Sequence, residues 1–235
     1  MNEAKHRFFC EDINSGFLSE EETTHALRVL RLKIGDTIQL IDGKGQLCLA
    51  TIADENKKGL CFLVTKKETK TQAGFDIHIA IAPTKNIDRF AFFLEKVTEI
   101  GVSRITPILS KNSERKDVKV DKLRKNLIAA IKQSGNLFLP IIDEPIELKK
   151  FLENQAHIKS KKFIAHCFDD IDKSELKNHI PTDKKLVILI GPEGDFTKEE
   201  VTLAKQSDFC AVSLGESRLR TETAGIIACH TVHII

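Results

Sequence analysis

Tryptophan and tyrosine are absent from this chain of 235 residues, and methionine occurs only once. Stacking on an aromatic ligand would therefore have to use phenylalanine, histidine or arginine side chains. Long apolar runs are also absent, since none approaches the roughly 18 residues that mark a membrane-spanning helix. No apolar core follows the basic residues Lys5, His6 and Arg7, as it would in a secretory signal. We therefore expect a cytoplasmic protein that is neither exported nor inserted into a membrane.

Paired cysteine motifs are missing too, because none of the six cysteines stands in a Cys-x-x-Cys arrangement. Four of them lie in apolar, strand-like sequence, namely Cys48, Cys61, Cys167 and Cys210. This setting favours small buried side chains in a reducing cytoplasm. Cys229, His230 and His233 could converge on one side of a C-terminal helix. No second pair of ligands accompanies them, so we predict a structural or interface role for these three residues and no bound metal.

Two common nucleotide-binding fingerprints are not found. The chain has neither the G-x-G-x-x-G spacing of a dinucleotide site nor the G-x-x-x-x-G-K-[ST] spacing of a phosphate-binding loop. The glycine loop at Gly191 carries carboxylates, Glu193 and Asp195, where a triphosphate would require a lysine. These absences argue against an enzyme that hydrolyses nucleoside triphosphates.

Composition indicates a globular chain of one large or two small domains, since 41% of the residues are hydrophobic. The formal net charge of +2 is too small to demand a nucleic-acid partner. The charge is uneven, however. Residues 111–132 contain eight basic and three acidic residues, a local excess of five positive charges. A solvated helix face and a surface that binds RNA phosphates would both explain such a segment.

The first 70 residues show short apolar stretches separated by glycine turns. Strands are predicted at Thr37 to Leu40, Leu47 to Ile52 and Leu60 to Thr65. Such closely spaced strands suggest a small β-barrel. Glu20 to Leu30 is the exception, because it is predicted to be a helix that brings His25, Arg28 and Arg31 close together. Lys66 to Gly74, rich in lysine, threonine and glutamine, is predicted to be a linker.

From Phe75 onward the pattern changes to alternating strands and helices, which indicates a mainly parallel sheet with helices on both faces. The predicted elements are strand Phe75 to Ala82, helix Ile87 to Ile100, strand Arg104 to Leu109, helix Asp121 to Ser134 and strand Lys162 to Cys167. In the first helix the apolar residues recur at helical spacing. Its phenylalanine-rich stripe is therefore predicted to face the core rather than to stack on a base.

Two further units of strand and helix complete the chain, and each strand ends in a glycine loop rich in polar residues. Leu186 to Ile190 is a fully apolar run that stops at Gly191, and Thr197 then begins a helix with capping-box spacing. Phe209 to Leu214 leads into an arginine-rich loop, and Gly225 to Ile235 is predicted to be an apolar helix. Ligands in open α/β sheets bind outside the carboxyl ends of strands, so we expect a ligand site at these loops. The alternative is that the glycines only turn the chain.

Five sequence motifs occur in an order that matches one protein family. They are His25 to Arg31, Glu95 to Val102, Ser113 to Arg115, LIGPEGDF from Leu189 to Phe196, and LGESRLRTETA from Leu214 to Ala224. Together they resemble the motifs of the RsmE family, methyltransferases that modify N3 of a uridine in 16S ribosomal RNA. The resemblance spans nearly the whole chain.

Two positions depart from the family pattern. Where the family usually has Glu-Gln-Ser followed by an arginine, this chain has Lys132 to Asn136, so the arginine that could contact RNA is missing. Asp195 stands where a second glycine is usual after the proline-glutamate-glycine motif. Aspartate tolerates the backbone shapes that glycine allows better than most residues do, and it adds a negative charge beside the site.

The resemblance implies a fold and partners. It implies a PUA-like RNA-binding β-barrel in residues 1–70 and a SPOUT methyltransferase domain in residues 71–235, tied into a trefoil knot near its C-terminus. SPOUT proteins hold S-adenosyl-L-methionine in the knot and act as homodimers. The C-terminal helix, apolar through Ile226, Ile227, Val232, Ile234 and Ile235, would then be part of the dimer interface. The implied RNA partner is 16S ribosomal RNA within the small ribosomal subunit.

The resemblance also implies which residues bind the cofactor and the RNA. The cofactor residues are Leu189, Gly191, Glu193, Gly194, Leu214, Gly215, Leu219 and Arg220. Among them, Leu214 and Leu219 would form apolar walls for the adenine. RNA contacts are predicted for His25, Arg28, Arg31, Arg115 and Lys116.

Catalysis requires a base, because uracil N3 is a poor nucleophile until its proton leaves. Glu222, which follows the arginines of the second loop, is the first candidate, and Glu99 is the second. The alternative for Glu222 is a first-turn carboxylate that the helix dipole stabilises. Arg220 suits the holding of phosphate or of the uracil oxygens better than proton transfer, because arginine stays protonated.

Two other functions stay open at this point. One is a different SPOUT RNA methyltransferase, acting on a ribose 2′-hydroxyl or on another base. The other is a catalytically silent RNA-binding module. Cofactor binding separates the module from the enzymes, because an adaptor has no need of two intact glycine loops.

Overall fold

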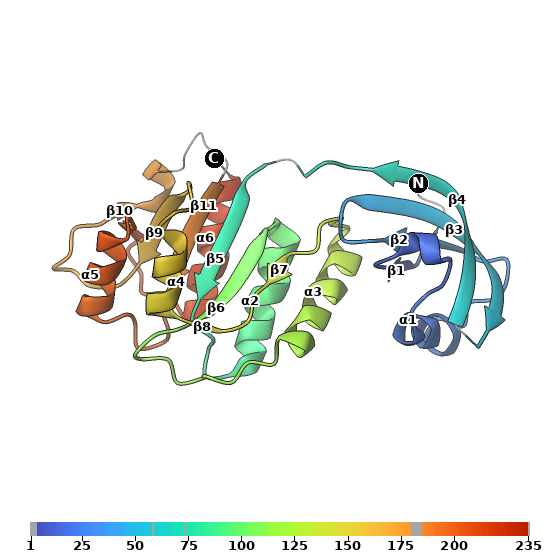
Figure 1. Ribbon diagram of the computed structural model, residues 1–235, viewed down its shortest axis with the longest axis horizontal. Helices are drawn as coiled ribbons and strands as arrows, with labels where there is room; N and C mark the ends of the chain where they lie inside the picture. Colours follow the sequence, from blue (N-terminus) through green and yellow to red (C-terminus); the bar gives the residue numbers. More distant parts are fainter. Residues whose placement is uncertain (1–3, 58, 73, 180–184, 235) are drawn as a thin grey trace. The chain divides into compact units, whose positions relative to one another are not determined.

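The computed structural model describes residues 4–57, 59–72, 74–179 and 185–234, and the chain divides into two compact units (Figure 1). The N-terminal unit consists of residues 1–73 and 128–139, and the C-terminal unit consists of residues 74–127 and 140–235. Helix α3, Val120–Ser134, contributes its first half to the C-terminal unit and its second half to the N-terminal unit. The predicted division after residue 70 did not include this return of the chain.

A four-stranded sheet forms the framework of the N-terminal unit. Its strands, paired in this order, are β1 (Arg7–Phe9), β2 (Thr37–Ile41), β3 (Gln46–Asn56) and β4 (Gly59–Thr69). Strand β1 runs parallel to β2, whereas the other pairs are antiparallel. Ile38 and Leu40 of β2 are fully buried in one core with Ala26 of the helical segment. The three predicted strands are confirmed, and the antiparallel strands fit the predicted PUA-like domain.

The helical segment of this unit changes its hydrogen bonding half-way. After the short 3₁₀ turn η1 (Ile13–Ser15), α1 (Glu20–Thr24) begins at Ser19, whose hydroxyl accepts from the Glu22 amide at 3.2 Å. The chain then continues as a π-helical turn, η2 (His25–Val29), in which the Leu30 amide donates to the His25 carbonyl at 3.0 Å. The predicted helix is therefore present, but its second half is π-helical.

The predicted linker Lys66 to Gly74 is wrong at its beginning, because residues 66–69 belong to β4. They pair with residues 46–49 of β3. The side chains on both faces of this part of β4 are exposed. They therefore show none of the apolar alternation that marks a half-buried strand. Backbone hydrogen bonds hold the extension, and a sequence pattern does not report them.

The second half of α3 is attached to the N-terminal unit by polar contacts. The Lys132 ammonium donates to both carboxylate oxygens of Glu22, at 2.7 and 2.8 Å, and lies 5.7 Å from the ring centre of Phe8. The Arg7 guanidinium donates to the Lys132 carbonyl at 3.4 Å and to Gln39 Oε1 at 2.9 Å. Glu22 is buried, so loss of Lys132 would remove its nearest cationic partner. Lys132, the first residue of the segment that departs from the family pattern, thus forms an ion pair with Glu22 in this chain.

An eight-stranded sheet forms the framework of the C-terminal unit, and all its described pairings are parallel. Its strands are β5 (Asp76–Ile81), β6 (Arg104–Leu109), β7 (Ile141–Ile142), β8 (Ile146–Glu147), β9 (Lys161–Ala165), β10 (Ser174–Glu175), β11 (Lys185–Ile190) and β12 (Cys210–Ser213). Their order is β10-β12-β9-β11-β5-β6-β7, with β8 beside β6. The predicted parallel sheet is confirmed.

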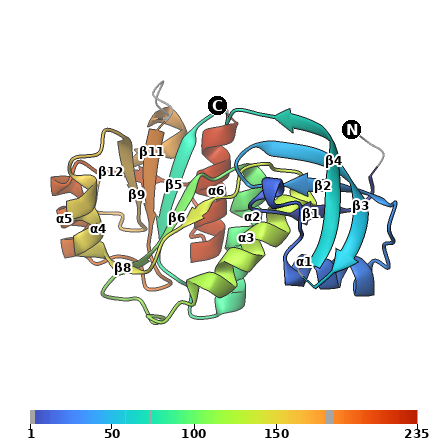
Figure 2. The same cartoon turned by 45° about the vertical axis from the view of Figure 1, so that its right-hand side comes forward.

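Helices cover both faces of this sheet (Figure 2). One face carries α2 (Ile87–Ile100) and α6 (Thr221–His233), and the other carries α4 (Leu148–Gln155) and α5 (Lys198–Gln206). A 3₁₀ turn, η3 (Leu176–His179), follows β10. Phe90, Phe93, Leu94 and Val97 are fully buried, so the stripe of α2 faces the core as predicted. Within the described ranges, every helix is too short or too polar to cross a bilayer. The trefoil knot stays a prediction.

The predicted start of the C-terminal helix is wrong. The helix begins at Thr221 rather than at Gly225, which puts Glu222 in its first turn. The glycine does not mark a helix boundary here. It lies within the helix, where a side chain would meet Phe93 and Ile81 of the core.

The predicted burial of the cysteines is only partly correct. Cys48 is buried and Cys61 is partly exposed, but Cys167 and Cys210 are exposed, because they stand beyond or at the end of their strands. Cys229 is buried, whereas His230 and His233 are exposed, so these three residues do not form a cluster. In the described part of the chain, no three His, Cys, Asp or Glu side chains are arranged to hold a metal. The absence of a metal remains a prediction.

A histidine is held uncharged inside the sheet of the C-terminal unit. His78 Nε2 lies 2.7 Å from Thr106 Oγ1, and the Thr106 hydroxyl in turn donates to Asp143. Asp143 also accepts two hydrogen bonds from Arg104, both at 2.8 Å. Burial, followed by the charge of Arg104, lowers the pKa of His78 to about 4. The network is therefore built around a neutral imidazole.

We expect this histidine to make stability depend on pH. As the pH falls through about 6.5 the unfolded state binds a proton at His78, whereas the folded state does so only near its pKa of about 4. The stabilisation is complete above pH 6.5 and is lost towards pH 4, by about 3 kcal/mol. His78→Gln keeps a hydrogen-bond donor but does not titrate. Urea unfolding at pH 7.5 and pH 4 measures the free energy of unfolding of both proteins. Between these pH values the wild type should lose more of it than His78→Gln, and equal losses would contradict the burial of a neutral His78.

A second prediction concerns the contact of α6 with α2. A Cβ atom at Gly225 would lie 2.5 Å from Phe93 Cε2 and 3.0 Å from Ile81 Cδ1, both in fully buried side chains. Gly225→Ala should therefore lower the free energy of unfolding by about 1 to 3 kcal/mol, although alanine favours an isolated helix by about 1 kcal/mol. His230→Ala, at an exposed position of α6, is the control and should stay within about 0.5 kcal/mol. A stabilised Gly225→Ala in urea unfolding would contradict this packing.

Candidate active site

Three neighbouring strands of the C-terminal unit end at one edge of the sheet, and the loops that follow them enclose a cavity of about 570 Å³. The loop after β9 contributes residues 165–167, 169 and 173, and the loop after β11 contributes residues 190–193 and 195. The end of β12, the loop that follows it and the first turn of α6 contribute residues 212–221 and 224. The cavity has the size of a small-molecule site and the position expected for ligands in open α/β sheets.

Six of the eight predicted cofactor residues line this cavity, namely Gly191, Glu193, Leu214, Gly215, Leu219 and Arg220. Leu189 does not, because it is fully buried in the core between the sheet and helices α4 and α5. Gly194 also lies outside the lining, and its backbone approaches Asn112 instead. The fold therefore brings most of the predicted residues together, and their contacts with a cofactor remain predictions.

Asp195 connects two of the three loops. Its backbone has a φ of +63°, in the left-handed region that glycine adopts most easily. Its carboxylate accepts from the Cys167 amide and from the Phe196 amide, both at 2.8 Å. The departure from the family pattern at this position thus keeps the backbone shape. It also adds a hydrogen bond between the loop after β11 and the loop after β9.

The loop after β9 is a part of the site that sequence reasoning missed. His166 is only 6% exposed, and its Nδ1 accepts from the Phe168 amide at 3.2 Å. Burial, followed by the charge of Lys173, lowers the pKa of His166. Because Nδ1 accepts a hydrogen bond, the neutral ring carries its proton on Nε2. Nε2 is buried and has no hydrogen-bond partner among the described residues. His166 therefore lines the cavity through other atoms of its ring or backbone, while Nε2 is buried beneath the surface.

A sequence signal for this third loop did exist. The predicted strand Lys162 to Cys167 ends in a histidine and a cysteine, which are polar groups at the carboxyl end of a strand. In the structure β9 ends at Ala165, so His166 and Cys167 belong to the loop. The segment has no glycine, so it lacks the feature that marks the other two loops in the sequence.

Charged side chains of both signs line the cavity. The carboxylates are Asp169, Glu193, Asp195 and Glu216, and the cations are Lys173, Arg218 and Arg220. Lys173 is held in place, because its ammonium donates to the Phe168 carbonyl at 2.9 Å. Arg220 is exposed and is the residue that precedes the first turn of α6. Together with the apolar Leu214 and Leu219, these groups suit a ligand that carries both charges on a partly apolar body.

Glu222, the first candidate base, is buried beside the cavity rather than in its lining. It is 7% exposed, and its neighbours Thr221 and Ala224 line the cavity. Glu222 Oε1 lies 3.9 Å from Arg89 Nε on α2, and Oε2 is buried without a partner among the described residues. The Glu222 carboxylate thus lies beside a guanidinium in the first turn of α6.

Glu99, the second candidate base, has a different environment. It pairs with Lys96 on the same helix, at 3.0 Å, and it does not line the cavity. Its position at the end of α2 separates it from the loops that follow β9, β11 and β12. The geometry therefore offers no support for Glu99 as the base.

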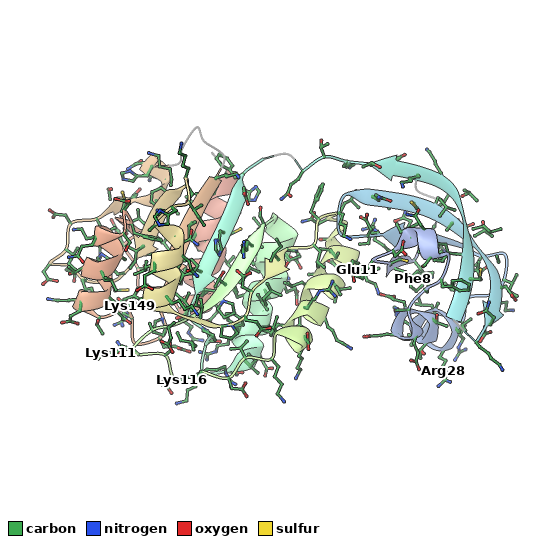
Figure 3. All side chains as sticks on the ribbon, in the orientation of Figure 1. Phe8, Glu11, Arg28, Lys111, Lys116 and Lys149 are labelled. Atoms are coloured by element: carbon green, nitrogen blue, oxygen red, sulfur yellow. The ribbon has the colours of Figure 1, made fainter. Side chains whose placement is uncertain are left out.

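Three predicted RNA contacts lie in one short segment of the N-terminal unit. Arg28, within the π-helical turn, and Arg31, just after it, are exposed, and Figure 3 labels Arg28. Arg31 has a φ of +56°, which is unusual for an arginine. His25 Nδ1 lies 3.9 Å from Glu22 Oε2. Single π-helical turns occur frequently at functional sites, so this segment is a candidate for RNA docking.

The other two predicted RNA contacts, Arg115 and Lys116, differ from each other. The Arg115 guanidinium donates to the carbonyl oxygens of Thr84, at 3.2 Å, and of Lys85, at 2.8 Å. Lys116 is exposed in the segment between β6 and α3 (Figure 3). The structure thus gives Arg115 partners within the protein, whereas it presents Lys116 to solvent.

Both parts of the chain match known protein families. Residues 71–233 match the model of an RNA methyltransferase domain, and residues 18–65 match that of an RNA methyltransferase PUA domain. The ribosomal RNA small subunit methyltransferase E of Buchnera aphidicola subsp. Acyrthosiphon pisum is 31% identical over 219 residues, which cover 90% of this chain and 85% of that protein. The chain belongs to the ribosomal RNA small subunit methyltransferase E family.

Solved structures similar to this methyltransferase E family member have the same fold. A probable rRNA-methyltransferase from Porphyromonas gingivalis matches with a TM-score of 0.88 and 36% identity, over 97% of each chain. A ribosomal RNA small subunit methyltransferase E from Neisseria gonorrhoeae, bound to S-adenosyl methionine, matches with a TM-score of 0.79 and 28% identity, over 95% of this chain and 94% of that one. The predicted RsmE family and its fold, an α/β domain preceded by a PUA-like domain, are confirmed.

Proposed function

We propose that this methyltransferase transfers the methyl group of S-adenosyl-L-methionine to N3 of one uridine in 16S ribosomal RNA. The cavity at the ends of β9, β11 and β12 is the observation that supports the proposal most directly. It lies in the segment that matches the RNA methyltransferase domain, and most of the predicted cofactor residues line it. The proposed substrate is RNA within the small ribosomal subunit in the cytoplasm, and the proposed reaction uses no metal.

The groups that line the cavity fit S-adenosyl-L-methionine. Leu214 and Leu219 provide apolar walls for an adenine ring. The carboxylates of the cavity wall suit the positively charged sulfonium and ammonium groups of the cofactor, and Arg218 suits the carboxylate of its methionine part. When bound, S-adenosyl-L-methionine supplies a methyl group on a positively charged sulfur. The protein contributes chiefly the positioning of the reactants and the local charges.

Two residues near the start of α6 receive catalytic roles in this proposal. Arg220 holds a substrate phosphate, or stabilises the uracil oxygens as negative charge develops on the ring. Glu222 accepts the proton of uracil N3, and the unpartnered Oε2 supports this role. Because Glu222 does not line the cavity, the uracil would approach it from the side of α6 that faces Arg89 of α2.

The proposed base can be tested by its pH profile. Glu222→Gln removes the proton acceptor, so turnover at neutral pH should fall by roughly 10² to 10⁴-fold. Activity should recover at high pH, where uracil N3 loses its proton to solvent. Glu99→Gln is the matched control, and its profile should follow the wild type because Glu99 pairs with Lys96. An unchanged pH profile in Glu222→Gln would leave Glu222 only its structural role.

The N-terminal unit is proposed to dock on the RNA through Arg28 and Arg31. Replacing both by alanine removes two phosphate contacts, which should weaken RNA binding by about tenfold and reduce the slope of log affinity against log salt by about 2. Lys57→Ala, an exposed lysine between β3 and β4, is the control and should bind RNA normally. Filter binding across a salt series measures both quantities. Normal affinity in the double variant would refute the docking role.

A homodimer is proposed through the packed pair of helices α2 and α6. Phe92 on α2 and Ile227 on α6 are 49% and 37% exposed, and Ile234 beyond α6 is exposed as well, so the packed pair of helices carries apolar side chains that a partner could cover. Phe92→Asp and Ile227→Asp should therefore yield monomers in sedimentation velocity. Ile158→Asp, at an equally exposed isoleucine after α4, should remain a dimer. A monomeric wild type would contradict the proposal.

The function itself is tested on the RNA. Small subunits from a strain that lacks this gene would be incubated with the protein and S-adenosyl-L-methionine, and the 16S RNA analysed by mass spectrometry. We expect one new N3-methyluridine at a single site. A methyl group on a ribose or on another base would point to a different RNA methyltransferase. No methylation and no cofactor binding would indicate a silent RNA-binding module.

A further inference from the structure

The segment between β6 and α3 touches two loops of the C-terminal unit. Residues 110–115, called the brace here, form a compact turn in which the Ser110 amide donates to Ser113 Oγ at 3.0 Å and the Ser113 amide donates to the Ser110 carbonyl at 3.1 Å. Both serines are buried. The turn therefore presents its remaining residues, Asn112 and Arg115 among them, from a fixed base.

One end of the brace holds the loop after β11, which lines the cavity. Asn112 Nδ2 donates to the carbonyls of Gly194 and Asp195, at 3.2 and 3.0 Å. The Lys111 amide donates to Glu200 at 2.8 Å, and Glu200 also completes the capping box of α5. A Cβ atom at Gly194 would lie 3.2 Å from Asn112 Cβ. Gly194 thus allows the close approach of the brace. This packing explains a glycine at a position that does not line the cavity.

The other end of the brace holds the loop between β5 and α2. Arg115 Nε lies 3.2 Å from the Thr84 carbonyl and 3.1 Å from the Lys85 carbonyl, and Arg115 Nη2 donates to the Lys85 carbonyl at 2.8 Å. Glu114 pairs with the Lys85 ammonium at 2.7 Å. The Lys85 amide then donates to Glu193 Oε1, at 2.9 Å. Arg115 is therefore two contacts away from a carboxylate that lines the cavity.

We propose that Arg115 is a positioning residue for the cofactor site: by holding Thr84 and Lys85 it directs the Lys85 amide at Glu193 and so fixes the loop after β11. The inference rests on the proposed function, since it takes the cavity to be the S-adenosyl-L-methionine site. It replaces the RNA contact that the resemblance implied for Arg115. The adjacent Lys116 is exposed and keeps that role.

The donor geometry favours this role over an RNA contact. Arginine presents a planar fork of donors, and here the Nε side of the fork is occupied by two successive carbonyls. A phosphate that took this edge of the guanidinium would displace both carbonyls and release the loop, and only the Nη1 edge is left for other acceptors. Glu193, in contrast, gains a charge-assisted hydrogen bond only while the Lys85 amide is held towards it.

The test measures the affinity for S-adenosyl-L-homocysteine by calorimetry, and separately the affinity for a 16S RNA fragment. Arg115→Ala should weaken binding of S-adenosyl-L-homocysteine by about tenfold or more and leave RNA affinity unchanged. Arg115→Lys, which retains a donor, should recover part of the loss. Lys116→Ala should show the reverse pattern, with weaker RNA binding and an unchanged affinity for S-adenosyl-L-homocysteine.

A double-mutant cycle separates positioning from general loss of structure. If Arg115 acts through Glu193, adding Arg115→Ala to Glu193→Ala should cause no further loss of affinity. Should Arg115→Ala fail to fold, as judged by thermal unfolding, Arg115→Lys carries the same cycle.

The outcomes distinguish the inference from the proposed function. Additive losses, or an Arg115→Ala protein with normal affinity for S-adenosyl-L-homocysteine and weaker RNA binding, would overturn the positioning role alone. A wild-type protein that binds no S-adenosyl-L-homocysteine would overturn the proposed function and this inference with it.

Discussion

The parallel pairing of β9 with β11 and β12 is the constraint on which the site depends. The register places Ala165 of β9 beside Ile190 of β11 and Val212 of β12, so the three strands end together. Strand β9 lies between two strands that follow it in the chain, and the chain must therefore cross over β9 after β11. Backbone hydrogen bonds thus bring three separate loops to one edge before any side chain contributes. The side chains then determine what the enclosed space can bind.

Carboxylates that accept backbone amides hold these loops in place. Asp195 accepts from the loop after β9, Glu193 from the loop after β5, and Glu200 from the brace after β6. Such charge-assisted hydrogen bonds are roughly twice as strong as neutral ones. They tie the segment after β11 to three neighbours at once. Glu193 and Asp195, whose charges argued against a phosphate-binding loop, therefore have a structural role. Both line the cavity, and both hold its wall in place by accepting backbone amides.

Much of the fold was predictable, because apolar spacing and caps are local signals. Helix α2 and strand β6 have the predicted bounds, and the capping box at Thr197 is formed. The predictions failed where long-range packing decides. Gly225 lies inside α6 because Phe93 needs the space, and the extension of β4 beyond residue 65 is held by its pairing with β3. In the site, glycine loops and the family resemblance led to two walls of the cavity. The third wall, at His166, follows a predicted strand that ends in polar residues rather than in a glycine loop. The partners of Arg115 depend on contacts between distant segments, which a single sequence does not display.

The most direct measurement is a crystal structure of the protein with S-adenosyl-L-homocysteine at saturating concentration. We predict that the ligand occupies the cavity between the loops after β9, β11 and β12, with Leu214 and Leu219 at its adenine. A ligand bound elsewhere on the chain, or an empty cavity in crystals that contain the ligand, would contradict the assignment of this edge of the sheet as the methyl-donor site.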